Sequence, residues 1–304
     1  MKLYAPNYYR DFVCIADKCR HSCCVGWEID VDDDTSQIYQ SLQNSYAGAI
    51  RDSLDISEGT PHFRLTEGEK CPHLNDCGLC GIILSLGEEY LCEICREHPR
   101  FYHDTPRGKE VGLGMACEEA CRLILESDNY QGFVEIGELD GDPEASDFDA
   151  LPHRARLYGI LSDRSKPYAD RLSEIRNTYG IFPEDLSDNG WRDKLASLEY
   201  LNDAHRESFD VYAASATVSA AQEVYLERAL AYWIFRHCSA AYDEADFAAS
   251  LGFALFCERL LASMTASLEE PSWEDFCELA RILSEELEYS EDNTEAIKAV
   301  FFSE

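Results

Sequence analysis

Four cysteines fall within eleven residues near the start of the chain, in the segment CIADKCRHSCCVGW (14–27). Thiols gathered so densely are not expected to pack together as inert small apolar side chains. Adjacent cysteines such as Cys23 and Cys24 rarely pair with each other, because a disulfide requires particular Cα and Cβ separations. Thiolates arranged around a soft metal ion avoid both difficulties, so this segment predicts a metal site.

The same pattern recurs downstream in CPHLNDCGLC (71–80), LCEIC (91–95) and ACEEAC (116–121). Eleven of the fourteen cysteines therefore precede residue 122, and we expect them to converge in space. The remaining three, Cys238, Cys257 and Cys277, lie in helical patterns and are expected to pack in the core.

The spacing of the cysteines leaves a zinc ion and an iron-sulfur cluster as alternatives for the bound metal. The pairs Cys77-x2-Cys80 and Cys92-x2-Cys95 fit one tetrahedral zinc site. Iron-sulfur clusters use more varied spacings, although the ferredoxin spacings are absent here. The C-x3-C-x2-C motif of radical chemistry on S-adenosylmethionine is also absent, and a lone Gly112-Leu113-Gly114 does not support a dinucleotide-type fold.

Composition indicates a globular chain in a reducing compartment. Hydrophobic residues make up 45% of the 304 residues, and we expect no run of about 18 apolar residues able to span a bilayer. The first ten residues, MKLYAPNYYR, lack the apolar core of a secretory signal. A cytoplasmic location follows as the expectation, which favours metal ligation over disulfides.

The formal net charge of -33 indicates which binding partners are favoured. Nucleic acid and anionic membrane surfaces are disfavoured, because both would be repelled. A lysine-bearing protein or a cationic small molecule is favoured, and the alternative is that the carboxylates only keep the surface solvated.

The pattern along the chain predicts a mainly α protein: a loop-rich α+β cysteine and metal-cluster module followed by an all-helical domain. We place the cysteine-rich domain at 1–137, an acidic linker at 138–152 and the helical domain at 153–304. We expect a short strand over 27–31, a helix over 35–54, another from about Ala116, and a helix capped by Ser272 and Asp275.

Several motifs in order resemble the flagellin lysine N-methylase family, within a wider group of zinc- or iron-chelating cysteine-cluster proteins. They are FVCIADKCRHSCCVGWEID (12–30), CPHLNDCGLCGI (71–82), LGEEYLCEICREHPR (86–100) and GLGMACEEACRLIL (112–125). The helical half agrees more loosely, through VYLERALAYWIFRH (224–237).

The resemblance implies a protein lysine N-methyltransferase that acts on flagellin or a similar lysine-bearing protein. It also implies S-adenosylmethionine as methyl donor and a [4Fe-4S] cluster, with zinc as the alternative. The cysteines that match the family, and that the resemblance makes the metal ligands, are Cys14, Cys19, Cys23, Cys24, Cys71, Cys80, Cys92, Cys95 and Cys117. Cys77 and Cys121 are additions in this chain, as is His73 at a position where the family tends to have an aromatic residue.

Other candidate residues follow from the chemistry. A sulfonium is attracted by carboxylates and aromatic faces, which makes candidates of Tyr8, Tyr9, Trp27, Glu28 and Asp30. The histidines among the cysteines are either metal ligands and proton carriers or ordinary hydrogen-bonded side chains; they are His21, His73, His98 and His103. The competing function from another class is a non-catalytic zinc or iron-sulfur module that acts as a scaffold or handles metal.

The ligand assignment predicts metal contents. Cys23→Ala and Cys95→Ala are each expected to lose metal and to destabilise the N-terminal half, because each removes a thiolate ligand. Cys257→Ala, far from the other thiols in sequence, is the control and is expected to leave the metal content unchanged. Elemental analysis of the purified variants checks this, and full metal retention in both of the first two would contradict the assignment.

Overall fold

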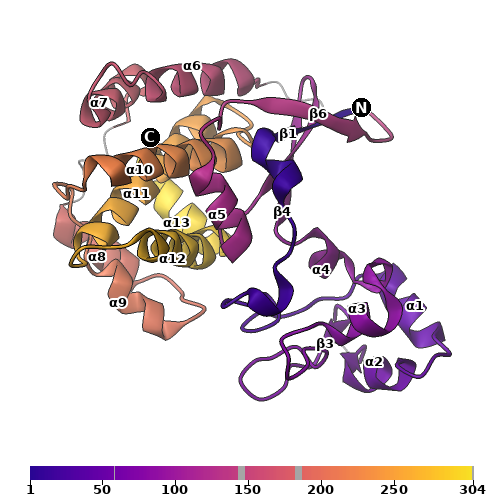
Figure 1. Ribbon diagram of the computed structural model, residues 1–304. Helices are drawn as coiled ribbons and strands as arrows, with labels where there is room; N and C mark the ends of the chain where they lie inside the picture. Colours follow the sequence, from indigo (N-terminus) through magenta and orange to yellow (C-terminus); the bar gives the residue numbers. More distant parts are fainter. Residues whose placement is uncertain (58, 143–147, 182–186, 303–304) are drawn as a thin grey trace. The chain divides into compact units, whose positions relative to one another are not determined.

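The computed structural model describes residues 1–57, 59–142, 148–181 and 187–302 (Figure 1). The chain forms two compact units, which we call the helical unit (residues 1–12 and 101–304) and the cysteine unit (residues 13–100). The expected fold class, mainly α with a few strands, is confirmed.

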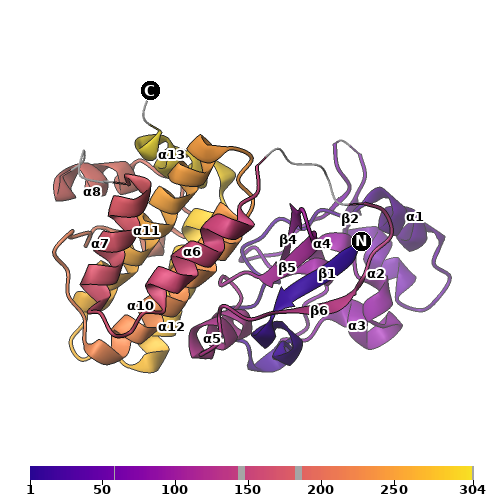
Figure 2. The ribbon, with the colours of Figure 1, turned by 90° about the horizontal axis from the view of Figure 1, so that it is seen from above.

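The division differs from the predicted boundaries, because residues 1–12 and 101–137 join the helices. The sheet that they build is the reason: strand β1 (Lys2–Pro6) pairs in parallel with β5 (Gly108–Leu113) and antiparallel with β6 (Phe133–Glu138). Strand β4 (Arg100–Thr105) completes the order β4-β5-β1-β6, and Figure 2 shows β1 between β5 and β6. Residues 143–147 of the predicted acidic linker lie outside the described residues.

Helices supply most of the helical unit. They are α5 (Glu118–Glu126), α6 (Leu151–Leu161), α7 (Tyr168–Tyr179), α8 (Asp188–Ala196), α9 (Arg206–Phe209), α10 (Ala220–Trp233), α11 (Glu244–Ala266), α12 (Trp273–Leu283) and α13 (Glu291–Lys298). Short 3-10 turns are η1 (Asn7–Asp11), η5 (Asp203–His205) and η8 (Ala299–Phe301). Two π-helices, η6 (Ile234–Cys238) and η7 (Ser284–Glu288), continue α10 and α12.

Sequence patterns located several of these helices well. The Ser272 side chain accepts from the Asp275 backbone N–H, and the Asp275 side chain accepts in return, so the predicted capping box is confirmed. Helix α5 begins two residues after Ala116, with Cys117 as its N-cap.

Helix α11 is the central core helix of the helical unit. Between Asp246 and Thr265 only Ala248 and Arg259 are not buried. Its length and mean hydropathy of 1.4 would suffice to cross a membrane, contrary to the expectation from the sequence, but 89% of that apolar window is buried inside the protein. Its apolar character is therefore accounted for by packing against α10, α12 and α13.

Buried carboxylates in the helical unit are paired with cations. Glu110 is fully buried and accepts from both terminal nitrogens of Arg154, at 2.6 and 2.8 Å. Glu227 accepts from Arg171 and Arg164, at 2.5 and 3.0 Å. Because an unpaired buried charge is costly, these pairs help to fix which strands and helices pack together.

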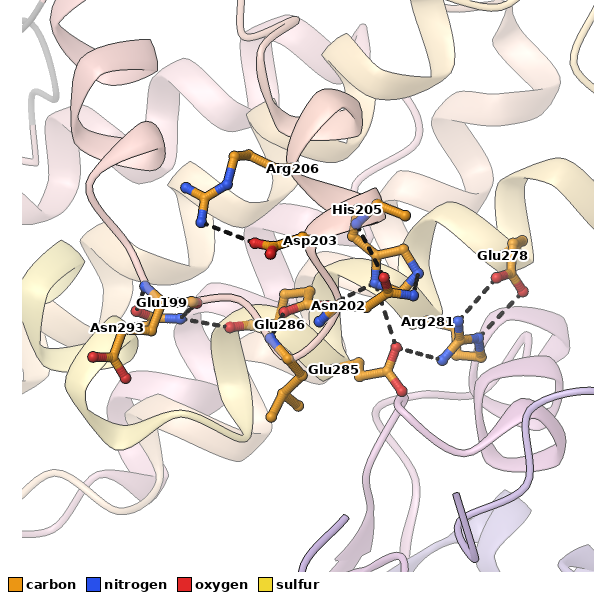
Figure 3. A network of polar contacts seen from close by, with 12 residues as sticks. Glu199, Asn202, Asp203, His205, Arg206, Glu278, Arg281, Glu285, Glu286 and Asn293 are labelled. Carbon is orange, nitrogen blue, oxygen red and sulfur yellow. Dashed lines mark hydrogen bonds and ion pairs between the residues drawn. The ribbon is translucent and has the colours of Figure 1, made fainter. Parts of the chain in front are cut away.

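A further carboxylate, Glu286 of η7, holds the loop before α9 (Figure 3). Its side chain is fully buried and accepts from the backbone N–H groups of Leu201 and Asn202, at 2.7 and 3.2 Å. The Asn293 side chain fastens the same loop by exchanging hydrogen bonds with the backbone of Glu199, at 2.6 and 3.1 Å.

The cysteine unit is built from short elements. They are η2 (Ala16–Lys18), α1 (Asp33–Ser41), α2 (Ala47–Ser53), β2 (Leu54–Asp55), β3 (His62–Phe63), α3 (Gly81–Leu86), η3 (Glu88–Tyr90) and α4 (Glu93–Glu97). Its apolar core is small and consists of Ile29, Val31, Tyr39, Ile50, Leu54, Phe63 and Ile82, together with the thiols of Cys71 and Cys92.

Two predictions for this unit were wrong. The helix expected over 35–54 is broken into α1 and α2, because the Asn44 side chain accepts from the backbone N–H groups of Tyr46 and Ala47 and starts a new helix. The strand expected over 27–31 is reduced to an isolated bridge between Asp30 and His62. The N-cap at Asp32, which accepts from Thr35 N at 2.9 Å, agrees with the predicted helix start.

The Glu286 contacts predict a stability effect. Glu286→Ala removes the buried carboxylate that accepts from Leu201 N, Asn202 N and His205 Nδ1, and is expected to lower the free energy of unfolding by about 2–4 kcal/mol. Urea unfolding followed by circular dichroism measures this. Glu269→Ala, at an exposed position, is the control and is expected to change stability by less than about 0.5 kcal/mol. Equal midpoints for the two variants would show that Glu286 does not hold the loop.

Candidate metal centre

Five thiols share the core of the cysteine unit. Cys71 and Cys92 are buried, and Cys24, Cys80 and Cys95 are partly buried and pack against the same core. We call these five the thiol pocket: Cys24, Cys71, Cys80, Cys92 and Cys95. They come from three of the four cysteine motifs (14–27, 71–80 and 91–95), so the fold brings together part of the expected set, whereas the motif at 116–121 belongs to the helical unit.

Helix starts position two of these thiols. Cys80 is the N-cap of α3 and Cys92 is the N-cap of α4. The free N–H groups and the dipole at a helix N-terminus favour a thiolate there. The Cys80 sulfur accepts from the backbone N–H groups of Ile82 and Ile83.

Backbone donors also reach the other sulfurs. Cys71 accepts from His73 N, at 3.5 Å, and from Leu74 N. Cys92 accepts from the backbone N–H of Cys95 and from its thiol, and this second bond holds the pKa of Cys92 below its usual value and raises that of Cys95. Such N–H···S bonds stabilise thiolates and tune metal-sulfur sites.

The pocket opposes full ionisation of its own thiols. Burial, and after it the neighbouring sulfurs of Cys24 and Cys80, raise the pKa of Cys71 to about 12. Cys24 resembles Cys92 in departing from this pattern, because a hydrogen bond from Cys23 lowers its pKa to about 7. A bound cation removes this opposition, since it turns repulsion between thiolates into shared attraction to the metal.

Aromatic side chains line the pocket. The pKa values of Tyr39 and Tyr46 are raised, first by burial and then by the nearby sulfurs, among them Cys80. Tyr39 is fully buried and donates its hydroxyl to Tyr90 O at 2.6 Å. These rings exclude water from the thiols.

His73 lies beside the pocket but has both ring nitrogens occupied. Nδ1 lies 3.1 Å from the Tyr46 hydroxyl, and Nε2 lies 3.0 Å from Ser53 Oγ. Burial lowers the pKa of His73 to about 4. The ring also packs edge-on against Phe63, so His73 is a neutral, hydrogen-bonded part of the core rather than a metal ligand.

The sulfurs are spaced too widely for a closed zinc triad. Tetrahedral zinc with Zn–S bonds near 2.3 Å places its sulfurs about 3.8 Å apart. Within the described ranges, no three cysteine sulfurs lie within 4.8 Å of one another. The described thiols therefore do not form a closed three-sulfur zinc geometry in this structure.

The other cysteines that the resemblance assigns as ligands lie elsewhere. Cys14 and Cys23 are exposed, and Cys19 donates to the carbonyl oxygen of His21 at 3.3 Å. Cys117 belongs to the helical unit, at the N-cap of α5. The added Cys77 is exposed on a turn in which Asn75 Oδ1 accepts from Cys77 N and Leu79 N.

The proposed sulfonium-binding residues are divided between the two units. Tyr8 is buried in the core of the helical unit, where burial raises its pKa, and Tyr9 packs against the same core. Trp27, Glu28 and Asp30 belong to the cysteine unit, and the two carboxylates are exposed. A buried Tyr8 presents no free aromatic face to a ligand.

A second group with metal-ligand chemistry is closed by its own hydrogen bonds (Figure 3). Among the described residues, the one group of three potential ligands within 4.8 Å is His205, Glu285 and Glu286. Asn202 Oδ1 accepts from Ala204 N, so its NH2 group faces His205 Nε2 at 3.4 Å. Nε2 must then be the acceptor, and the proton on Nδ1 is donated to Glu286 at 2.6 Å.

Arg281 closes the other side of this group. Its guanidinium bonds the Glu285 oxygen at 2.9 Å, the same oxygen that lies 3.8 Å from His205 Nδ1. A divalent cation would compete with both the Nδ1 proton and the guanidinium. We therefore assign this group a structural role in holding the loop before α9.

Sequence reasoning missed one polar cluster in the helical unit. Glu288 is buried in η7 and accepts from His237 Nε2 at 2.7 Å and from the Tyr232 hydroxyl at 3.2 Å, while Arg236 Nε lies 3.4 Å away. The Tyr232 hydroxyl also accepts from Met115 N at 3.1 Å, which holds the segment leading to α5. The sequence did contain a signal for this cluster, because Arg236 and His237 stand in an otherwise apolar helical stripe.

Comparisons with known proteins were made by sequence and by structure. The chain is 26% identical over 140 residues to the lysine-N-methylases of Salmonella choleraesuis (strain SC-B67) and Salmonella typhimurium (strain LT2). Each match covers 43% of this chain and 34% of the relative. The chain is also 26% identical over 165 residues to the flagellar biosynthetic protein FliU of Salmonella muenchen, covering 51% of this chain and 94% of that protein.

These similarities confirm the resemblance inferred from the cysteine motifs. The match spans about a third of the length of the two lysine-N-methylases. No protein-family model matches the chain, and no solved structure matches it significantly.

The pocket predicts which thiols hold metal. Cys92→Ser keeps a good N-cap for α4 but replaces a soft thiolate by a hydroxyl, and is expected to weaken metal retention at least about tenfold. Cys77→Ser, at an exposed position, is the matched control and is expected to keep the metal content of the unchanged protein. Metal per chain after dialysis against a chelator is the measurement. Equal retention by the two variants would contradict the pocket.

Proposed function

We propose that this chain is a protein lysine N-methyltransferase that uses S-adenosylmethionine and an iron-sulfur cluster to modify flagellin or a similar lysine-bearing protein. The thiol pocket is the observation that carries the proposal. The similarity to proteins named lysine-N-methylase supports the transferase class. The similarity to a flagellar biosynthetic protein supports a flagellar substrate.

The donor set fits a sulfur-ligated cluster. The five pocket thiols exceed the four ligands that a [4Fe-4S] cluster needs, and their backbone N–H donors suit thiolates. The wide spacing of the sulfurs supports a cluster over a single zinc ion. When bound, such a cluster supplies electron-transfer chemistry or an open iron position for a ligand.

The protein's own residues exclude water from this region and favour the thiolate form of one of its sulfurs. Tyr39, buried under the thiols, excludes water, and Cys23 donates the hydrogen bond that favours the Cys24 thiolate. Both effects strengthen electrostatic attraction to a cation in the pocket, because the local dielectric is low.

The charge of the chain suits the proposed substrates. A surface carrying most of a net charge of -33 attracts a protein rich in lysine and the cationic sulfonium of the methyl donor. A lysine amine, with an ordinary pKa near 10.4, must lose its proton before it attacks the sulfonium methyl. The reaction then transfers the methyl group to nitrogen and releases S-adenosylhomocysteine.

The test begins with protein purified without oxygen. We expect about four irons and matching sulfide per chain. With labelled S-adenosylmethionine, we expect label in flagellin lysines, and its loss in Cys92→Ser but not in Cys77→Ser. Mass spectrometry of flagellin identifies the methylated residues.

The other outcomes separate the alternatives. Iron and sulfide without binding of S-adenosylmethionine would point to a non-catalytic cluster module. Stoichiometric zinc without iron would favour a structural metal module and remove the cluster from the proposal.

A further inference from the structure

Two thiols meet across packed helices of the helical unit. Cys121 lies on α5 and Cys277 on α12, and these helices pack together. The Cys121 thiol donates to the carbonyl oxygen of Cys277 at 3.5 Å and hydrogen-bonds the Cys277 thiol. This pair is separate in sequence and in unit from the thiol pocket.

The two thiols differ in exposure. Cys121 is only 1% exposed, whereas Cys277 is partly exposed. Arg281 follows Cys277 by one helical turn on the same side of α12, where its guanidinium pairs with Glu278 and Glu285. A partly exposed first thiol with a buried second thiol behind it is the arrangement of an attacking and a resolving cysteine.

The other thiols of the helical unit differ from this pair in position and burial. Cys238 and Cys257 are fully buried in the core, and burial raises the pKa of each. Cys117 lies one turn before Cys121 on the same side of α5, but the three sulfurs of Cys117, Cys121 and Cys277 do not all lie within 4.8 Å in the described chain. The group is therefore a dithiol and not a closed three-thiolate metal site.

We propose that Cys121 and Cys277 form a peroxide-oxidisable dithiol that closes reversibly to a disulfide between α5 and α12. The Cys277 thiolate attacks one oxygen of hydrogen peroxide, the O–O bond breaks, and Cys277 sulfenic acid and hydroxide form. Cys121 then attacks the Cys277 sulfur, the S–O bond breaks, and the proton of Cys121 leaves with the hydroxyl as water. In total, two thiols lose two electrons and two protons, and one peroxide is reduced to two waters.

The disulfide restrains α5 against α12. Cys117, one of the thiols that the resemblance makes a metal ligand, starts α5. Oxidation of the dithiol thus fixes the helix that Cys117 starts. This proposal does not depend on methyl transfer and is read out separately from it.

The full chain is treated with hydrogen peroxide, its free thiols are alkylated, and its peptides are mapped by mass spectrometry. We expect a linked peptide pair containing Cys121 and Cys277 that disappears after treatment with dithiothreitol. Circular dichroism of each variant below confirms that it is folded before oxidation.

Variants separate the dithiol from simple packing. Cys121→Ser removes the resolving thiol, and we expect Cys277 to accumulate as sulfenic and sulfinic acid. Cys277→Ser is expected to leave Cys121 reduced, because the buried thiol does not meet peroxide. Cys257→Ser, on α11, is the matched control and is expected to retain the linked peptide.

Three results would overturn the proposal. In the first, Cys277 of the unchanged protein oxidises to sulfinic acid while Cys121 stays a free thiol. In the second, the linked peptide joins Cys121 to a cysteine other than Cys277. In the third, Cys121 and Cys277 both stay reduced while exposed cysteines oxidise.

Discussion

Repulsion between thiolates in a water-poor pocket is the constraint on which the cysteine unit depends. Its core has few large apolar side chains, and two of its buried positions are the thiols of Cys71 and Cys92. Units of this size gain little stability from such a core alone. The proposed metal centre, holding thiols from three cysteine motifs, would supply the missing connection and so couple metal binding to folding of the cysteine unit.

In the helical unit the electrostatic constraint is the burial of carboxylates. The chain carries many more carboxylates than cations, yet the carboxylates buried in this unit are matched to particular partners, as Glu110 is to Arg154 and Glu227 to Arg171. Each pair joins elements far apart in sequence, and losing one partner leaves an uncompensated charge in the core. The excess negative charge is consequently left to the surface, where it acts on partners rather than on the fold.

Local signals were predictable from the sequence and long-range pairings were not. The capping box at Ser272 and the start of α5 depend on neighbouring residues and were located correctly. The unit boundaries depend on β1 pairing with β5, more than a hundred residues later, which no local pattern reports. The same reason limits prediction of the candidate metal site. The spacing of the cysteines singled out Cys92 and Cys95, whereas only the fold shows that Cys80 packs in the core and that Cys77 is exposed.

The order of the strands has a consequence for synthesis of the protein. Because β1 must wait for β5 and β6, the sheet of the helical unit cannot close until about residue 138 has left the ribosome. Residues 13–100 are an insertion in that unit and emerge complete before this point. The thiols of the cysteine unit can therefore come together during synthesis, while the strand that precedes them is still unpaired.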